Sequence, residues 1–291
     1  VDELVLPWAI EKTKPALVVL LNLGRDQLDR LSEVRMVANK WRNAINSTVN
    51  VLASADDPFI AYSVENAGKV IWFSAGSKGH IDAATCPSCG ALLNWNQDRS
   101  SYQCNCGFKK PDADLILDGN VLNEKIQIVP AIPGAAALQN AARAVIVGSE
   151  FGIGVTDALS AISKVTAVDG RFDHKKIGST EFRLLLAKNP ASWSETLHTS
   201  SQGPENVLLI VNANTQDGKD TSWLWDVDFS SLKSRKVLVT GERRTDVAAR
   251  LTINEVPHKV VTDVIEAAKA FGNSKADLIA SYTAFHRLVK K

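Results

Sequence analysis

The four cysteines of the chain have a spacing that could hold a metal ion. They form two pairs, and each pair is followed directly by a glycine: Cys86 and Cys89 with Gly90, and Cys104 and Cys106 with Gly107. A tetrahedral zinc ion needs four soft ligands that converge on one point, and two tight turns joined by a hairpin can supply them. A glycine after each pair can adopt the left-handed conformation that directs backbone N–H groups at the sulfur atoms. We therefore predict a zinc ribbon over about residues 81–112.

Two disulfides are the alternative interpretation of this cysteine cluster. Disulfide frameworks are typical of small secreted domains, whereas this chain is large and lacks the basic start of a signal peptide. Zinc is favoured, although the second pair has C-x-C spacing instead of the commoner C-x-x-C. Four thiolates leave no open coordination position, so the ion would be structural and not catalytic.

Several acidic and amide side chains stand where strands or helices are expected to begin or end. Asp56 and Asp57 precede Pro58, and Asp217 and Asp220 follow an apolar run at residues 207–211. From spacing alone, Asp217 and Asp220 are turn or helix-capping acids, while Asp56 and Asp57 fit either a turn or a polar site that faces the substrate. Asn189, before Pro190, fits either a helix N-cap or a position that faces the domain cleft. The five histidines are scattered and none lies at ligand spacing from a cysteine, so we interpret them as surface or structural residues.

Apolar runs alternate with amphipathic segments along the chain, which is the pattern of an α/β protein. In the first half, we predict strands at residues 16–22, 50–52 and 70–73, and a helix at residues 28–45. The run at residues 16–22 is typical of a central parallel strand. Residues 115–117 and 126–129 predict a β-ribbon turned by residues 118–120, followed by helices at about 135–147 and 157–165.

The alternating pattern restarts in the second half of the chain. Strands at residues 184–186, 207–211, 237–239 and 259–261, with helices between them, predict a second α/β unit with a mostly parallel sheet. We place the domain boundary near residue 170.

Length and composition agree with two such units. At roughly 150 residues per domain, 291 residues suggest two domains. Apolar residues make up 45% and charged residues 22%, which excludes a disordered, collagen-like or coiled-coil chain. The formal net charge of +1 gives no electrostatic field for nucleic acid or anionic membranes. The longest apolar run, at residues 16–21, is too short for a transmembrane helix.

The segments that punctuate these elements resemble motifs of the Mur ligase superfamily and, within it, of its MurT-like members. Residues 1–3, 21–30 and 55–58 are similar to successive strand-end motifs of the Mur central domain. A zinc ribbon inserted in that domain is characteristic of MurT-like members. Asn189-Pro190 is similar to part of a signature near the C-terminal domain, and residues 212–223, NANTQDGKDTSW, resemble the MurT signature loop.

This resemblance implies a fold and its boundaries. It implies a Mur ligase central domain at residues 1–170, with the ribbon inserted at about 81–112, and a Rossmann-like α/β domain at residues 171–291. Mur ligases hold ATP phosphates on a Gly-rich loop that no stretch of this chain matches, and Gly152-Ile153-Gly154 lacks the lysine. The expectation is that an N-terminal segment with this loop is absent, and that this polypeptide alone does not turn over ATP.

The resemblance also implies an activity. MurT-like chains are the ATP-dependent ligase subunits of a glutamine-dependent amidotransferase. With ATP and Mg²⁺, they activate the α-carboxylate of D-glutamate in the stem peptide of lipid II, which ammonia converts to D-isoglutamine. The ammonia comes from a heterodimer partner, a class I glutaminase of the GatD type. The expected location is the cytoplasm, at the inner surface of the membrane, in peptidoglycan biosynthesis.

Individual residues follow from the resemblance position by position. Asp217 matches the acid that orients the catalytic histidine of the partner, and Asp220 is the second choice. Asn140 and Arg171 match nucleotide contacts, although Ala137 stands where Mur-like proteins usually carry a first asparagine.

Two other functions fit parts of the pattern. One is a zinc-ribbon binding module on an α/β scaffold without catalysis, and the other is a Mur or folylpolyglutamate-type ligase that adds an amino acid. The ribbon and the signature loop favour the amidotransferase over the second alternative. The near-zero net charge disfavours nucleic acid as the ligand of a binding module.

Overall fold

The computed structural model describes residues 3–24, 33–80, 82–168 and 170–289. It divides into two compact units. The first consists of Val1–Val129 and Gln139–Leu159, and the second of Pro130–Leu138 and Ser160–Lys291. Among the described residues, no helix combines the length and the apolar character that crossing a bilayer requires.

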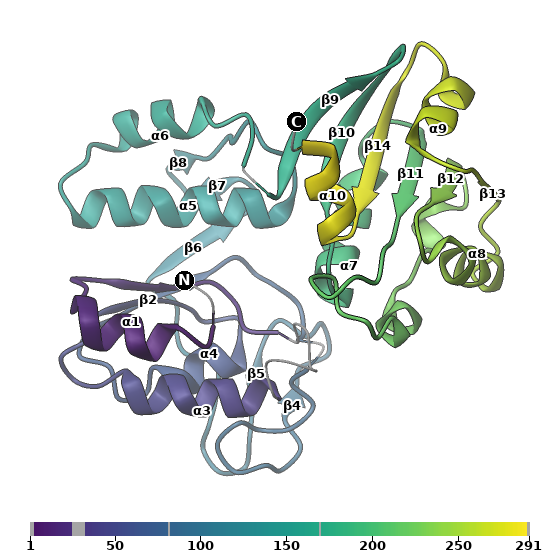
Figure 1. Ribbon diagram of the computed structural model, residues 1–291. Coiled ribbons are helices and arrows are strands. Elements are labelled where there is room, and N and C mark those ends of the chain that lie inside the picture. The colour runs from purple at the N-terminus through teal and green to yellow at the C-terminus, as the bar shows by residue number, and fades with distance from the viewer. Residues whose placement is uncertain (1–2, 25–32, 81, 169, 290–291) are drawn as a thin grey trace. The chain divides into compact units, whose positions relative to one another are not determined.

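The first unit is built on a six-stranded sheet in the order β1-β2-β3-β6-β7-β8 (Figure 1). Four of its strands are parallel: β1 (Val18–Leu20), β2 (Val51–Ser54), β3 (Val70–Ser74) and β6 (Leu115–Asp118). The predicted strands at 50–52 and 70–73 are confirmed. The prediction of a central strand at 16–22 is wrong, because β1 lies at the end of the sheet as described. Helices cover β1, and its residues Val18 and Leu20 are buried. This burial explains the apolar run without a central position in the sheet.

The ribbon predicted after the cysteines is confirmed in its two strand segments and its turn, but the two segments do not pair with each other. A tight turn joins β6 to β7 (Val121–Leu122), and β7 pairs with β8 (Ile126–Gln127), so three short strands form an antiparallel meander. The register Asp118↔Val121 places only Gly119 and Asn120 in the turn, with φ of +55° at Gly119. This two-residue connection is a normal hairpin turn. The sequence pattern did not predict β7 as a separate strand.

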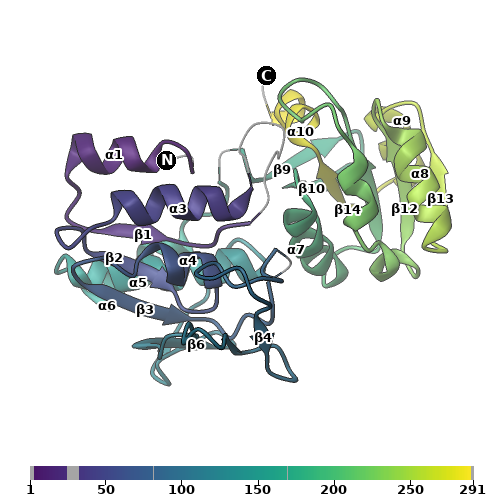
Figure 2. The same ribbon diagram turned by 90° about the horizontal axis from the view of Figure 1, so that it is seen from below.

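Helices cover both faces of the first sheet. On one face, α1 (Leu6–Thr13), α3 (Val34–Ala44) and α4 (Pro58–Ser63) pack against β1 and β2 in one apolar core. Figures 1 and 2 show α5 (Ala135–Glu150) and α6 (Val155–Ser163) on the opposite side from α3. The helices predicted at 135–147 and 157–165 are confirmed. Of the helix predicted at 28–45, residues 28–32 lie outside the described residues, and α3 forms the remainder.

A small hairpin interrupts the chain between β3 and β6. Its strands, β4 (Asn94–Trp95) and β5 (Tyr102–Gln103), are antiparallel, and single bridges join Thr85 to Leu92 and Gln103 to Lys109. The ring of Tyr102 is stacked on Phe108 and meets Trp95 edge-on. These aromatic rings belong to the same apolar core as α3 and α4, so the hairpin packs on the first unit.

The second unit contains a six-stranded sheet in the order β13-β12-β11-β14-β10-β9. Its parallel strands are β10 (Thr180–Leu186), β11 (Asn206–Ile210), β12 (Lys236–Thr240), β13 (His258–Val260) and β14 (Lys275–Ala280), and β9 (Phe172–Ile177) is antiparallel. The mostly parallel α/β unit is confirmed. Sequence patterns gave no expectation for β9 or for β14, which lies between β10 and β11.

Two apolar cores sandwich this second sheet. One contains α7 (Pro190–Ser201), α8 (Arg244–Ile253) and two short 3₁₀ helices, η1 (Ser222–Asp226) and η2 (Ser230–Leu232). The other contains α9 (Val264–Phe271) and α10 (Tyr282–Val289). Asn189 is the N-cap of α7, one of the two roles that its spacing allowed, and its side chain accepts the Ser192 N–H at 2.8 Å.

Candidate functional site

The four cysteine side chains converge on one point in the ribbon, as their spacing predicts. All four Sγ atoms lie within 4.8 Å of one another, and they are free thiols. The Sγ atoms of Cys86 and Cys106 are 3.8 Å apart, and those of Cys89 and Cys104 are 3.5 Å apart. Tetrahedral bonds of about 2.3 Å from zinc would place sulfur ligands about 3.8 Å apart. The cluster could therefore hold a tetrahedral metal ion.

The backbone around the cluster directs N–H groups at the sulfur atoms. Gly90 and Gly107 have φ of +81° and +94°, the left-handed conformation expected from the sequence. The N–H of Phe108 lowers the pKa of Cys106 to about 7, so this thiol ionises near neutrality. Burial raises the pKa of Cys86 to about 12. A cation at the centre would favour the thiolate of every member.

The ribbon is fastened to the carboxyl end of β2 by a buried ion pair. The Nζ atom of Lys110 lies 2.7 Å from Oδ1 of Asp56, with side chains only 17% and 4% exposed. Asp56 also accepts hydrogen bonds from the Ser74 hydroxyl and from the N–H groups of Ala75 and Ser77. The Tyr102 hydroxyl donates to the carbonyl of Ala55 at 3.0 Å. Two ribbon side chains thus contact consecutive residues at the end of one strand.

The neighbouring carboxylate, Asp57, joins three segments of the first unit. It is the N-cap of α4, where it accepts the N–H groups of Phe59 and Ile60, and it also accepts the Leu23 N–H at 2.7 Å. Its Oδ2 lies 3.5 Å from Nε2 of His80. Asp57 is therefore a helix N-cap, a role that the sequence did not predict, while Asp56 is a buried ion-pair partner.

His80 is a structural histidine with a perturbed pKa. Its ring contacts Phe59 edge-on, and Nε2 lies 3.0 Å from the Leu23 carbonyl. Burial lowers the pKa of His80, but the carboxylates of Asp57 and Asp82 and the Leu23 carbonyl together outweigh burial, so the pKa lies above 6.5. The N–H of Asp82 donates to Nδ1 at 3.2 Å and must move when that nitrogen takes a proton.

A buried arginine completes the polar cluster at this end of the sheet. Arg143 of α5 is 5% exposed, and its guanidinium lies 4.5 Å from the centre of the Phe73 ring. Its Nε atom has no hydrogen-bond partner. Burial lowers the pKa of Arg143 to about 10, and the charge of Asp56 opposes that shift. The cluster therefore contains two carboxylates and two cations away from solvent.

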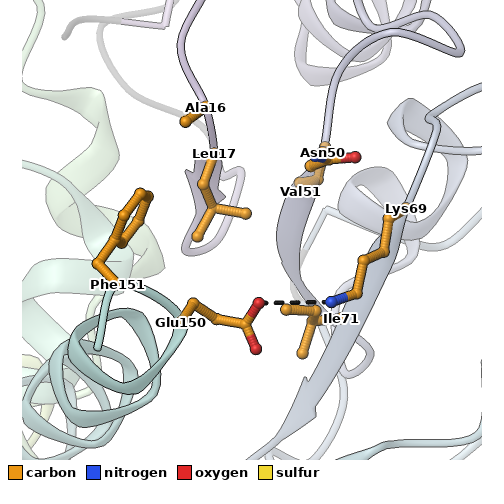
Figure 3. Close-up of a pocket in the computed structure, with 8 residues that line it drawn as sticks. All are labelled: Ala16, Leu17, Asn50, Val51, Lys69, Ile71, Glu150 and Phe151. Atoms are coloured by element: carbon orange, nitrogen blue, oxygen red, sulfur yellow. Dashed lines mark hydrogen bonds and ion pairs between the residues drawn. The ribbon is translucent and has the colours of Figure 1, made fainter. Parts of the chain in front are cut away.

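A small pocket of about 140 Å³ lies at the other end of the same strands (Figure 3). Its lining residues precede or begin β1, β2 and β3 or end α5, and Lys69 and Glu150 form an ion pair of 3.4 Å across it. In open α/β sheets, ligands bind outside the carboxyl ends of the strands. This pocket is at the amino ends, so we do not take it as the functional site.

In the second unit, Asp217 lies in the loop after β11, and its side chain is buried with 6% exposure. Oδ1 accepts the Thr283 N–H at 2.7 Å, and Oδ2 accepts the Thr283 hydroxyl at 2.5 Å and the Asn214 N–H at 3.0 Å. The position of Asp217 in a loop at a strand end is as expected. Its carboxylate points into the unit, toward Thr283 of α10.

The rest of the signature loop is more exposed. Oδ1 of Asp220 accepts the Ser222 N–H at 2.8 Å, which is the turn role expected from spacing alone. That hydrogen bond lowers the pKa of Asp220. Trp223 packs against Trp193, while Trp225 is 63% exposed and lies under the Arg250 guanidinium. One tryptophan of the alternating pair is therefore half-buried and the other faces solvent.

The two residues matched to nucleotide contacts are both exposed. Asn140 lies on α5 in the first unit, three residues after the half-buried Ala137. Arg171 follows the left-handed Gly170, and its N–H donates to the Val168 carbonyl at 2.9 Å. Residues 1–2, 25–30 and 169 of the motifs quoted above lie outside the described residues.

Sequence reasoning missed the residues that hold these carboxylates in place. The sequence predicts no partner for His80 and no ion pair for Lys110. Arg143 and Thr283 were not singled out. An arginine on the apolar face of an Ala-rich helix was the one local signal available for Arg143.

The two sheets, the inserted ribbon and the strand-end carboxylates together define a Mur ligase-like α/β protein. The pseudomurein peptide ligase type C from Methanothermus fervidus has a TM-score of 0.68, with 16% identity over 94% of this chain and 62% of that one. A MurF structure from Acinetobacter baumannii has a TM-score of 0.60, with 15% identity over 96% of this chain and 60% of the other. The chain therefore has the Mur ligase fold.

The comparisons with sequence families and curated proteins are more specific. Residues 186–285 match the family model described as MurT ligase C-terminal. The chain is 28% identical to the MurT subunit of lipid II isoglutaminyl synthase (glutamine-hydrolyzing) from Staphylococcus aureus, over 90% of this chain and 66% of that protein. For the Streptococcus pneumoniae subunit, 28% identity extends over 98% of this chain and 71% of the relative. The chain thus spans about two thirds of the length of the curated relatives it matches.

Proposed function

We propose that this chain is the central and C-terminal part, at about residues 1–170 and 171–291, of the ligase subunit of a glutamine-dependent lipid II amidotransferase. The observation that carries the proposal is the MurT-type domain at residues 186–285, which presents Asp217 at the carboxyl end of β11. The subunit would use ATP and Mg²⁺ to activate the α-carboxylate of D-glutamate in lipid II. Ammonia would then replace the activating group and leave D-isoglutamine.

The ammonia would come from a GatD-type glutaminase bound to this chain. In our proposal, Asp217 orients the histidine of that partner, because a cysteine nucleophile needs its base held in one tautomer and a third, acidic group can hold it. A buried carboxylate fixed by three donors suits this role, since its position does not vary with solvent. The heterodimer would act at the cytoplasmic surface of the membrane, where its lipid-linked substrate lies.

The metal in the ribbon is proposed to be zinc in a structural role. Four thiols at tetrahedral spacing support zinc, and they leave no position for a substrate. Asn140 and Arg171 are the proposed nucleotide contacts, through an amide at the adenine and a guanidinium at the phosphates. Substitution of either by alanine should raise the KM for ATP of the full-length complex.

The decisive experiment compares two acids of the same loop in the complex of full-length subunit and glutaminase. We expect Asp217→Asn to lower kcat for glutamine hydrolysis by about a thousandfold or more, as loss of an orienting acid does in related triads. Asp220→Asn is the matched control, because Asp220 is exposed and bonded within its own turn. Unchanged hydrolysis by the Asp217 variant would reject the assignment, and loss only with the Asp220 variant would move the role to Asp220.

A second assay separates amidation from amino-acid addition. The complex should convert lipid II to its amidated form with ATP and glutamine, and should not extend the stem peptide when free amino acids are supplied. Addition of an amino acid would instead favour a ligase of the folylpolyglutamate or stem-peptide type.

A further inference from the structure

The carboxylate of Asp217 is held by a residue far away in the sequence. Thr283, at the second position of α10, donates its N–H to Oδ1 and its hydroxyl to Oδ2. Both groups come from one residue, so the two oxygens of the carboxylate are fixed in distance and in rotation about χ2. Asn214 adds a third donor from within the signature loop.

The direction of the Thr283 hydroxyl bond follows from its neighbours. Its Oγ1 receives the side-chain amides of Asn212 at 3.2 Å and Asn214 at 3.1 Å. The Asn212 amide is oriented independently, because its oxygen accepts the Glu242 N–H at 3.1 Å. A hydroxyl has two lone pairs and one proton. With both lone pairs engaged, the proton of Thr283 is directed at Asp217.

These contacts leave the carboxylate with one direction for a further donor. An ionised carboxylate accepts about four hydrogen bonds, and the three described here occupy two sites on Oδ2 and one on Oδ1. A fourth donor would therefore meet Oδ1. In the proposed function, that donor is the imidazole N–H of the glutaminase.

We propose that Thr283 is a positioning residue for glutamine hydrolysis in the complex, acting through Asp217. This inference rests on the proposed function, because Thr283 itself touches neither glutamine nor the partner's histidine. Its hydroxyl and the amides of Asn212 and Asn214 hold the carboxylate so that Oδ1 faces the imidazole. The signature loop thus depends on the first turn of α10, which lies 66 residues further along the chain.

The test uses the full-length subunit in complex with its glutaminase and compares Thr283→Val, Thr283→Ser and Thr252→Val. Valine keeps the shape and the backbone N–H but removes the hydroxyl, and serine restores it. Thr252 is the matched control, since it is an exposed threonine of α8 whose hydroxyl donates to the Ala248 carbonyl one turn earlier. We expect Thr283→Val to lower kcat by about tenfold to a hundredfold, as loss of a hydrogen bond to a charged group would. The KM for glutamine and the affinity for the partner should change less than twofold.

Thr283→Ser should recover most of the kcat that Thr283→Val loses. If Thr283 were purely structural, Thr283→Val would instead lower the melting temperature or the affinity for the partner and leave the kcat of the assembled complex intact. If Asp217→Asn abolishes hydrolysis while Thr283→Val matches Thr252→Val, the positioning role is wrong and the role of Asp217 stands. If Asp217→Asn has no effect, the proposed function of that acid fails, whatever the result at Thr283.

Discussion

Replacement of Lys110 by methionine tests whether the ribbon stabilises the strand ends of the first unit. The substitution keeps an unbranched side chain and removes the cation that lies 2.7 Å from Oδ1 of Asp56. The carboxylate, only 4% exposed, would be left without its closest cation. The ribbon would also lose the bond from Lys110 to the Ser100 carbonyl, which measures 2.8 Å.

The magnitude follows from what remains around Asp56. Removing one partner of a fully buried ion pair costs about 3–5 kcal/mol. Here the Ser74 hydroxyl and two backbone N–H groups stay in place at 2.6–3.1 Å, and Lys110 itself is 17% exposed. Both facts reduce the penalty, so we expect a loss of about 2 kcal/mol in the free energy of unfolding of the first unit.

Hydrogen exchange resolved by peptide is the appropriate assay, because it reports β2 and β3 separately from the second unit. Lys109→Met is the matched control, as Lys109 is the exposed neighbour of Lys110 in the ribbon. A double-mutant cycle with Asp56→Asn should give a coupling energy above about 1 kcal/mol. If Lys110→Met and Lys109→Met differ by less than about 0.5 kcal/mol, the buried pair does not stabilise this edge.

Three further predictions concern pH, metal and capping. The pKa of His80 is raised beside Asp57 in the folded protein. Its contribution to stability is therefore present below about pH 6.5 and is lost as the pH rises through the folded pKa. The destabilisation by His80→Gln should accordingly be larger at about pH 6 than at about pH 8.5. The purified protein should contain about one equivalent of zinc, and its removal by a chelator should expose four thiols to titration and weaken hydrogen-exchange protection of the ribbon. Asn189→Ala should cost about 1 kcal/mol in chemical denaturation, because α7 loses its N-cap.

Each of these has a contradicting outcome. If His80→Gln loses the same amount of stability at both pH values, Asp57 does not stabilise the protonated ring. Thiols that react completely before chelation would exclude a bound metal. For the cap, Ser194→Ala on the exposed side of α7 is the control, and an equal loss of stability in both variants would reject the capping contribution.

The sequence by itself determined the features that depend on neighbours along the chain. The spacing of the two cysteine pairs and their glycines predicted the hairpin and the convergence of the sulfur atoms. Periodicity located the helices at 135–147 and 157–165 and most strands, and Asn189-Pro190 fitted the start of α7. These features are local, because a few consecutive dihedral angles or a single turn decide them.

Only the tertiary structure decided which distant groups surround each carboxylate. Asp56 meets Lys110 and Asp57 meets His80 because the ribbon folds back on the end of β2. Asp217 meets Thr283 because β11 and β14 are neighbours in the sheet, so the segments that follow them emerge at one edge. Strand order is set by long-range pairing, which the spacing of residues along the chain does not reveal. For the same reason, the sequence predicted neither the edge position of β1 nor the strand β14. The sequence therefore supplied the acids, and the folded sheets determined which donors and cations hold them.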